Sequence, residues 1–324
     1  MNKTVAAAMV AVGFSGLPAA AADLGGKMAT KAPPVVEAPS PFDYAFGAAV
    51  MNDYIFRGIS QSARKPSLFA YGEARYNALP NLQFYAGSAA ESIDFPNHAA
   101  AEIDFYAGFR PTFDKLSLDF GFWYYWYPGG QTFNGLGGPE TCANGAFSPA
   151  PGLGCNVIKS DLSYWEVFGK ASYALNDIVT PGATVFYSPS WLNSGAYGLF
   201  ASGTLKVNLP TLPVFPKDVG WYLSGEGGYY WFGTTDAFYG SIKLPDYATW
   251  NIGLAFTYKV FTLDLRYHDT NLSKANCNAL TGDHTATFNP AAITPINGSG
   301  LESKWCGSAF VAKFSSDLTL GSLK

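Results

Sequence analysis

The ten residues AEIDFYAGFR, at positions 101–110, decide the fold, because polar and apolar side chains alternate along them with a period of two. Glu102 and Asp104 fall on one face of an extended chain, whereas Ile103 and Phe105 fall on the other. The stretch therefore predicts a β-strand with one charged face and one apolar face.

Three more stretches, residues 116–126, 250–259 and 261–268, show the same alternation. A soluble sandwich also alternates, but it hides its apolar face, whereas a membrane barrel shows that face to lipid. Charged residues make up only 14% of the chain, against about 25% in ordinary soluble domains. Aromatic residues reach 16%, and Tyr and Trp gather where apolar and polar surroundings meet. The composition favours the barrel.

A helical membrane span is excluded on length, because no run of about 18 apolar residues follows the first 22. A bilayer protein without spanning helices must close its strands into a barrel, since every backbone polar group in lipid needs a partner. We therefore predict an all-β fold, a transmembrane antiparallel β-barrel of about twelve strands.

The predicted strands are joined by short periplasmic turns on one rim and longer extracellular loops on the other, with both termini on the turn side. Aromatic girdles are expected on both rims: residues 123–127, residues 229–232 and Trp191 by the loops, and Tyr44, Tyr173, Trp221 and Tyr258 by the turns. The strands are predicted at residues 43–57, 66–78, 80–93, 99–113, 115–128, 160–175, 180–192, 196–208, 219–232, 246–259, 260–272 and 302–318.

The N-terminus predicts export. Residues 1–22 combine Lys3, an apolar stretch too short to span and a small-residue cleavage site, which together are typical of a secretory signal peptide. Residues 23–41 carry four prolines and no period, and we expect an extended periplasmic linker. The barrel would occupy residues 42–324, in the outer membrane of a Gram-negative cell.

The four cysteines form two pairs, each within one polar loop. Four cysteines allow three connectivities, but this placement predicts two local disulfides, Cys142 with Cys155 and Cys277 with Cys306. Zinc-type spacings of Cys and His are absent, so no metal and no other cofactor is predicted.

Five stretches resemble the TorF-type porins, a family of proteobacterial outer-membrane barrels of unknown function: NDYIFRGISQ at 52–61, YYWYPG at 124–129, YSP at 187–189, DYATW at 246–250 and LDLRYHDT at 263–270. The resemblance covers residues 43–272 and implies an outer-membrane pore without an established substrate. The cysteine-bearing loops look like insertions relative to shorter members of the family.

The sequence also departs from the barrel pattern at its end. It ends with LGSLK rather than with the terminal aromatic that many barrels present to the assembly machinery, so the sequence does not fix the residue at which the last strand ends. Phe314 is the candidate for its last lipid-facing aromatic.

No catalytic set is predicted. Only His98, His268 and His284 could serve as imidazole bases, and the neighbours His268 and Asp269 point to opposite faces of a strand. The net charge of −4, without a basic run, makes a nucleic-acid partner unexpected.

The alternation of side chains along each predicted strand places a set of polar residues inside the barrel. There they line water or pair with one another, because a charge facing lipid is costly. Acidic and basic members are nearly balanced, which argues against strong ion selectivity. The set is Asp53, Arg57, Glu73, Arg75, Glu102, Asp104, Arg110, Asp119, Glu166, Lys170, Lys206, Glu226, Asp264, Arg266, His268 and Lys313.

Twelve strands enclose a lumen between a filled barrel and an open channel. We therefore predict a narrow passive channel for small hydrophilic solutes or ions, in contact with outer-membrane lipid. The alternative is a closed barrel that acts as a structural or surface-interaction protein through disulfide-braced loops. The sequence identifies neither the solute nor the oligomeric state.

The run at residues 52–61 raises a finer question. If strand one continues through it, Asp53 and Arg57 face the lumen, Tyr54 and Phe56 face the outer girdle, and Gly58 lets the chain turn. Arg57 would then either contact solute at the outer mouth or brace the loop through a carboxylate, and the sequence leaves both interpretations open.

Overall fold

The computed structural model describes residues 41–131, 133–134, 157–210, 213–214, 216 and 218–320. The predicted signal peptide at 1–22 lies outside the described residues, as does the predicted linker at 23–41 apart from Pro41. Both stay predictions.

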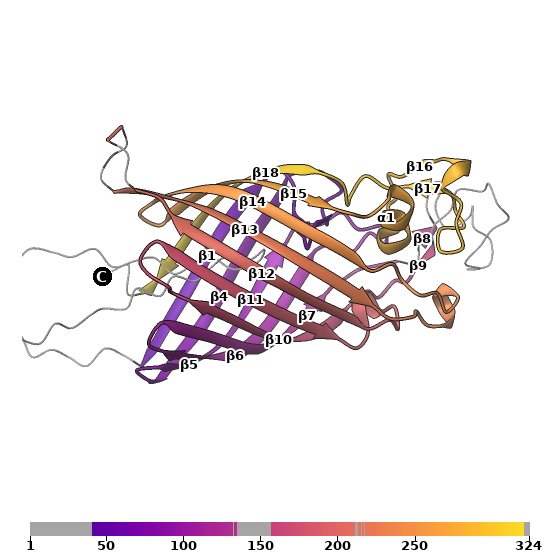
Figure 1. Ribbon diagram of the computed structural model, residues 1–324. Coiled ribbons are helices and arrows are strands. Elements are labelled where there is room, and N and C mark those ends of the chain that lie inside the picture. Colours follow the sequence, from indigo (N-terminus) through magenta and orange to yellow (C-terminus); the bar gives the residue numbers. More distant parts are fainter. Residues whose placement is uncertain are drawn as a thin grey trace, which may run out of the picture.

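Twelve antiparallel strands close into a barrel, which confirms the predicted fold class and strand number (Figure 1). Each strand pairs with the next barrel strand along the chain, and β1 closes the ring by pairing with β18. The strands are β1 (Phe42–Met51), β4 (Ser67–Leu79), β5 (Leu82–Glu91), β6 (Glu102–Phe113), β7 (Leu116–Trp126), β10 (Tyr164–Tyr173), β11 (Val179–Ser188), β12 (Gly198–Asn208), β13 (Val219–Phe232), β14 (Tyr247–Tyr258), β15 (Phe261–Thr270) and β18 (Ala309–Thr319).

Side chains alternate between the lumen and the outside, as the period of two requires. On β6, Glu102 and Asp104 are buried, whereas Phe105 and Phe109 are exposed on the outer surface. Large apolar side chains are exposed in this way on all twelve strands. An outward apolar surface on a closed barrel is typical of a barrel that faces lipid.

The two rims differ in the length of their connections (Figure 1). At one rim the turns are short, apart from the connection between β12 and β13 at residues 209–218. For example, β6 and β7 are joined by Asp114-Lys115, where Asp114 takes the left-handed conformation that a two-residue hairpin needs. The other rim carries the long loops. The start of β1 and the end of β18 both lie at the turn rim, as predicted.

The loops contain short elements of their own. Helix α1 begins after Ser273, whose hydroxyl accepts a hydrogen bond from the Asn276 amide, and ends at Gly282 in the left-handed conformation. The elements are β2 (Ile55–Phe56), β3 (Ile59–Ser60), β8 (Phe133–Asn134), β9 (Val157–Ile158), α1 (Lys274–Thr281), β16 (Thr287–Phe288), β17 (Leu301–Glu302) and 3-10 turns at Trp191–Asn193, Ala237–Tyr239 and Pro290–Ala292. Among the described residues, no helix has the length and hydropathy to cross a membrane.

The predicted first strand, 43–57, is wrong at its end. The chain leaves the wall after Met51, and β2 and β3 form a separate hairpin with Arg57 and Gly58, both at positive φ, as its turn. Tyr54 and Phe56 therefore do not face the outer girdle: Tyr54 is buried, and Phe56 is half-buried beside the ring of Tyr125.

Other predictions at the rims also need correction. Trp191 is buried rather than part of a lipid-facing girdle, because it packs against the inward rings of Tyr230 and Phe232. The last strand begins at Ala309 instead of residue 302, because Leu301–Glu302 pairs with Thr287–Phe288 inside the loop.

A disulfide joins Cys277 in α1 to Cys306, as the sequence predicted. It ties the helix to the segment that leads into β18. The other predicted bridge, Cys142 with Cys155, lies outside the described residues.

Replacing Cys277 and Cys306 together by Ser should leave the barrel folded and loosen only the loop between β15 and β18, because strand pairing holds the barrel. The electrophoretic mobility of unheated protein reports the barrel, and limited proteolysis reports the loop. A variant that loses its heat-modifiable mobility would contradict this separation.

Candidate functional site: a hairpin inside the barrel

The β2–β3 hairpin crosses the lumen from one wall to the opposite one. It is attached to β1 and β4, which are neighbours in the ring, and β11 and β12 lie half a circumference away. At the hairpin's tip, the Arg57 guanidinium carbon lies 4.5 Å from the ring centroid of Phe186 on β11 and 4.8 Å from that of Phe200 on β12. Only a hairpin folded inward can place these groups together.

Arg57 is held by an ion pair with Glu166 of β10. Its two terminal nitrogens donate to the two carboxylate oxygens at 2.7 Å each, and the side chains are 4% and 0% exposed. Arg57 also donates to the Tyr230 hydroxyl at 2.8 Å, and Tyr125 donates to Glu166 at 3.0 Å. The planar guanidinium suits this bidentate geometry, and the surrounding rings add cation–π attraction. The buried charges are thus fully matched.

The remaining residues of the hairpin contact other strands. Tyr54 donates to Glu102 on β6 at 2.7 Å, and Tyr247 of β14 donates to the Arg57 carbonyl at 3.0 Å. Gly58 lies so close to Thr249 and Thr270 that a Cβ atom at its position would be 2.4 Å from both side chains. Glycine is therefore required there for its positive φ and for lack of space.

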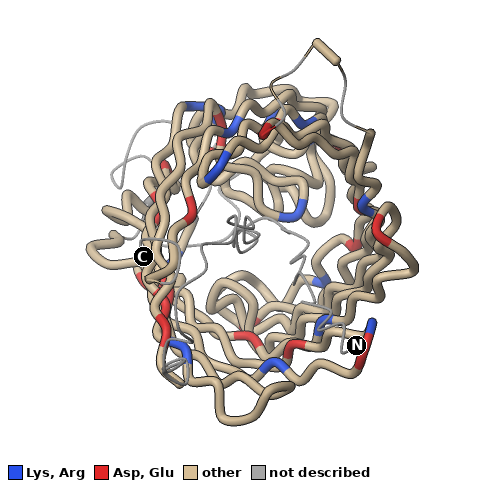
Figure 2. Tube along the Cα trace, turned by 90° about the vertical axis from the view of Figure 1, so that its left-hand side faces the viewer, with Lys and Arg blue, Asp and Glu red and all other residues tan. Residues whose placement is uncertain are grey.

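Together these contacts reach β6, β7 and every strand from β10 to β15, so the hairpin spans the barrel from wall to wall on the loop side. In the view from the turn rim, Figure 2 shows described segments within the outline of the ring of strands. A cavity of about 50 Å³ lies beside the hairpin, among Phe56, Ile59, Tyr127 and Trp305. It has room for water.

The base of the hairpin is organised around Asp53. Its carboxylate accepts hydrogen bonds from Ser60 at 2.6 Å, Ser62 at 3.0 Å and Arg64 at 3.0 Å. Burial raises the pKa of Asp53, and these three donors act in the opposite direction. Arg64 also donates to the carbonyls of residues 304, 305 and 307, which links the hairpin to the disulfide-bonded loop.

Closer to the turn rim, the lumen is charged. On the wall formed by β4 to β7, Glu73 pairs with Arg75 at 2.5 Å and with Arg110 at 2.8 Å, and Arg110 reaches Asp119 at 3.4 Å. On the wall formed by β13 to β15, Arg266 pairs with Asp264 at 2.8 Å. Acidic and basic positions are intermingled around the circumference (Figure 2).

Two lysines in this part of the lumen form no ion pair with any described residue: Lys170 lies 4.6 Å from the ring centroid of Phe168 and Lys206 4.1 Å from that of Tyr222. Lys313 lies nearer the loop rim, opposite Met51 at the end of β1 and 5.5 Å from the ring centroid of Phe69. An ammonium group without a carboxylate in contact stays charged in such a place only if water reaches it. This half of the lumen is therefore suited to hold water.

All sixteen residues predicted to face the lumen are buried or half-buried. The structure brings four of them together around Glu73, and Glu226 joins Asp264 and Arg266 through Asn251. Asp53 and Arg57 belong to the hairpin rather than to the wall. Whether the set lines a conducting pore stays a prediction.

The sequence prediction missed the aromatic hydroxyls around Arg57 and the carboxylate of Glu91. Tyr125 and Tyr230 were assigned to an outer girdle. Each lies two residues from a buried, inward side chain, Trp123 and Phe232 respectively, and therefore faces inward itself. Glu91 is buried on the same face of β5 as Tyr85 and Ala89, so parity could have identified it too.

A family profile described as "Bacterial protein of unknown function (Gcw_chp)" matches residues 35–180, less than half of the chain. The TorF resemblance itself stays a prediction. No functionally curated protein shows significant similarity to the chain.

Solved structures with a similar fold include the NanC porin (9% identity, TM-score 0.43, covering 85% of this chain and 98% of that one) and the toluene transporter TodX of Pseudomonas putida (12%, 0.39, 87% and 88%). LpxR from Salmonella typhimurium is a third (9%, 0.37, 85% and 99%). Likeness at this level is no basis for assigning a function.

Replacing Arg57 by Ala should destabilise the protein by about 3–5 kcal/mol, because it leaves the Glu166 carboxylate buried without its partner. Urea unfolding of the refolded protein measures the loss.

A cysteine placed at Ile59, which is buried in the hairpin, should react faster with an impermeant maleimide in the Arg57→Ala variant than in the protein that keeps Arg57. Arg75→Ala, a change to a lumen arginine outside the hairpin, is the control and should leave this reaction rate unchanged. A changed ion selectivity with unchanged stability and labelling would instead mean that Arg57 contacts solute.

Proposed function

We propose that the protein is an outer-membrane channel for small hydrophilic solutes or ions, and that the β2–β3 hairpin closes it at rest on the loop side. The observation that carries the proposal is the inward hairpin with its buried Arg57–Glu166 pair, above a charged half of the lumen. A water-filled vestibule accommodates Lys170 and Lys206, neither of which forms an ion pair with a described residue.

The closure depends on one short segment, which makes it reversible in principle. The hairpin's turn comprises two residues, and polar contacts fix it to the opposite wall. Polar contacts can be exchanged for water when the segment moves, whereas a barrel filled by wall side chains has no single part to move. With acidic and basic groups nearly balanced, the open channel is expected to discriminate weakly between ions.

The same proposal covers the cellular setting. A chain exported by a cleaved signal peptide would reach the outer membrane through the barrel-assembly machinery and contact lipid with its outer apolar surface. We propose no catalytic activity, because the chain has three histidines and the neighbours His268 and Asp269 lie on opposite faces of β15.

A second candidate is the closed structural or surface-interaction barrel. The observation that favours it is the loop cap: the Cys277–Cys306 disulfide braces α1, and Arg64 joins that loop to the hairpin. In this case the hairpin would be a permanent part of the interior and the loops would be the functional surface.

Conductance of a hairpin-shortened variant distinguishes the two. Met51 and Ser67 are direct partners across β1 and β4, so a short Gly-Ser turn can replace residues 53–65 without disturbing the wall. In planar bilayers we expect low, intermittent conductance from the refolded mature chain and a conductance about tenfold or more higher from the variant, because a wider aqueous path opens.

The control shortens the loop between β13 and β14, residues 236–243, and should conduct as the parent does. If removal of the hairpin leaves conductance unchanged, the lumen is blocked elsewhere, the channel proposal fails and the closed barrel is preferred.

A further inference from the structure

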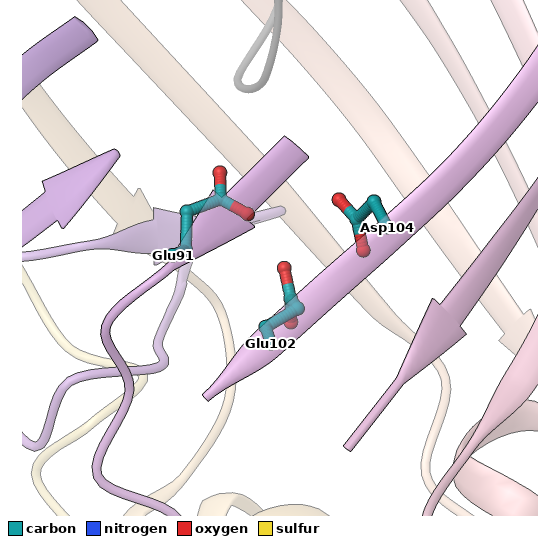
Figure 3. A group of neighbouring side chains, drawn as sticks. All are labelled: Glu91, Glu102 and Asp104. Atoms are coloured by element: carbon teal, nitrogen blue, oxygen red, sulfur yellow. The ribbon is translucent and has the colours of Figure 1, made fainter. Parts of the chain in front are cut away.

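Three buried carboxylates meet where the wall lies under the base of the hairpin (Figure 3). Glu91 ends β5, and Glu102 is its direct partner at the start of β6. Asp104 follows two residues later and so lies on the same face. One oxygen from each carboxylate lies within 4.8 Å of the other two. Like charges placed opposite each other on neighbouring strands destabilise a sheet, so this arrangement needs a compensating group.

Lys313 attracts Glu91 electrostatically, but the described part of the chain supplies none of the three carboxylates with a positive charge in contact. Its ion pairs engage other carboxylates, and none includes Glu91, Glu102 or Asp104. All three side chains are nonetheless almost completely buried, at 4%, 2% and 3% exposure.

Glu102 differs from the other two carboxylates in its hydrogen bonds. Its carboxylate oxygens accept from Tyr54 at 2.7 Å and from Tyr127 at 2.6 Å. In contrast, Glu91 Oε2 and Asp104 Oδ1 are buried and accept no hydrogen bond from any described residue. Glu91 lies close enough to Glu102 to share a proton with it, and the Trp123 indole lies beside Asp104. Two acceptor oxygens without donors, on carboxylates that converge on one point, require a positively charged partner, either a proton or a cation.

We propose that Glu91, Glu102 and Asp104 bind a divalent metal cation, with Ca²⁺ preferred to Mg²⁺. When no two of the three oxygens are more than 4.8 Å apart, some point lies within about 2.8 Å of all three, so small shifts bring them to a calcium distance of about 2.3–2.6 Å. The ligands are oxygen alone, which suits hard cations rather than zinc or copper. Three carboxylates can offer six oxygens to Ca²⁺, whereas Mg²⁺ retains several waters, for which a buried site has little room.

The tyrosine hydroxyls give the site its second layer. Tyr54 and Tyr127 hold the Glu102 carboxylate in place, as outer hydrogen bonds commonly orient metal ligands. Tyr54 belongs to the base of the hairpin and Tyr127 follows β7, so the bound ion would tie the hairpin to the wall. The proposal does not rest on the channel function, because the carboxylates converge in an open or a closed barrel alike.

Terbium luminescence tests the site directly, because Tb³⁺ replaces Ca²⁺ and is sensitised by nearby tyrosines such as Tyr54 and Tyr127. The refolded mature chain, stripped with chelator, should show sensitised emission that Ca²⁺ abolishes by competition and Mg²⁺ abolishes less well. Ca²⁺ should also raise the melting temperature of the stripped protein.

The Glu91→Gln and Asp104→Asn double variant keeps the shapes of the side chains and removes two charges, and it should lose both the emission and the calcium-dependent melting shift. Glu226→Gln, a change to a lumen carboxylate hydrogen-bonded to Asn251, is the matched control and should keep both. If the double variant fails to fold, Asp104→Asn alone should bind Tb³⁺ at least about tenfold more weakly.

Two outcomes would overturn the proposal. The first is a wild-type protein with neither sensitised emission nor a melting shift at millimolar Ca²⁺, which means that the carboxylates hold protons instead. The second is emission that persists undiminished in the charge-removed variants, which means that the ion binds elsewhere.

Discussion

The closed ring of backbone hydrogen bonds is the constraint on which the rest of the structure depends. Once β1 pairs with β18, every residue of a strand faces either the lumen or the outside, and the period of two leaves no third choice. An outer surface exposed to lipid must be apolar, so the charges within the span of the strands are directed inward. Asp269, on the outward face of β15, lies at the loop end of that strand. The charged interior is therefore a consequence of closure, and its internal pairing decides what the barrel can do.

That interior is divided into two halves of different chemistry. Near the loops, aromatic rings surround the buried Arg57 guanidinium. Its two charge-assisted hydrogen bonds to Glu166 compensate for the removal of the guanidinium from water. Near the turns, arginines share carboxylates with one another, and lysines lie over rings without a carboxylate in contact. The first half is built to exclude water and the second to tolerate it, which is the arrangement expected of a closure above a vestibule.

Local alternation was enough to predict the strands, because the signal for a strand lies within a few residues of the chain. Glu102, Asp104, Asp264 and Arg266 were placed inside the barrel from parity alone, and the structure has them buried or half-buried. Alternation failed at residues 52–57, where it continues through a segment that leaves the wall. The partners that fix this segment, Glu166 and Tyr230, are 109 and 173 residues away from Arg57, and no local pattern reports such a distance.

The carboxylate group shows a related limit. Parity can assign Glu91 and Glu102 to the lumen one by one, but only the register between β5 and β6 places them opposite each other. The hairpin then covers them, since Tyr54 reaches Glu102 from its base. A segment that buries acidic groups must supply them with protons, cations or donors, and among these three carboxylates the hairpin supplies a donor, Tyr54, to Glu102 alone. The position of the hairpin and the charge state of the carboxylates are therefore linked: whatever neutralises Glu91 and Asp104 also stabilises the hairpin in the position that covers them.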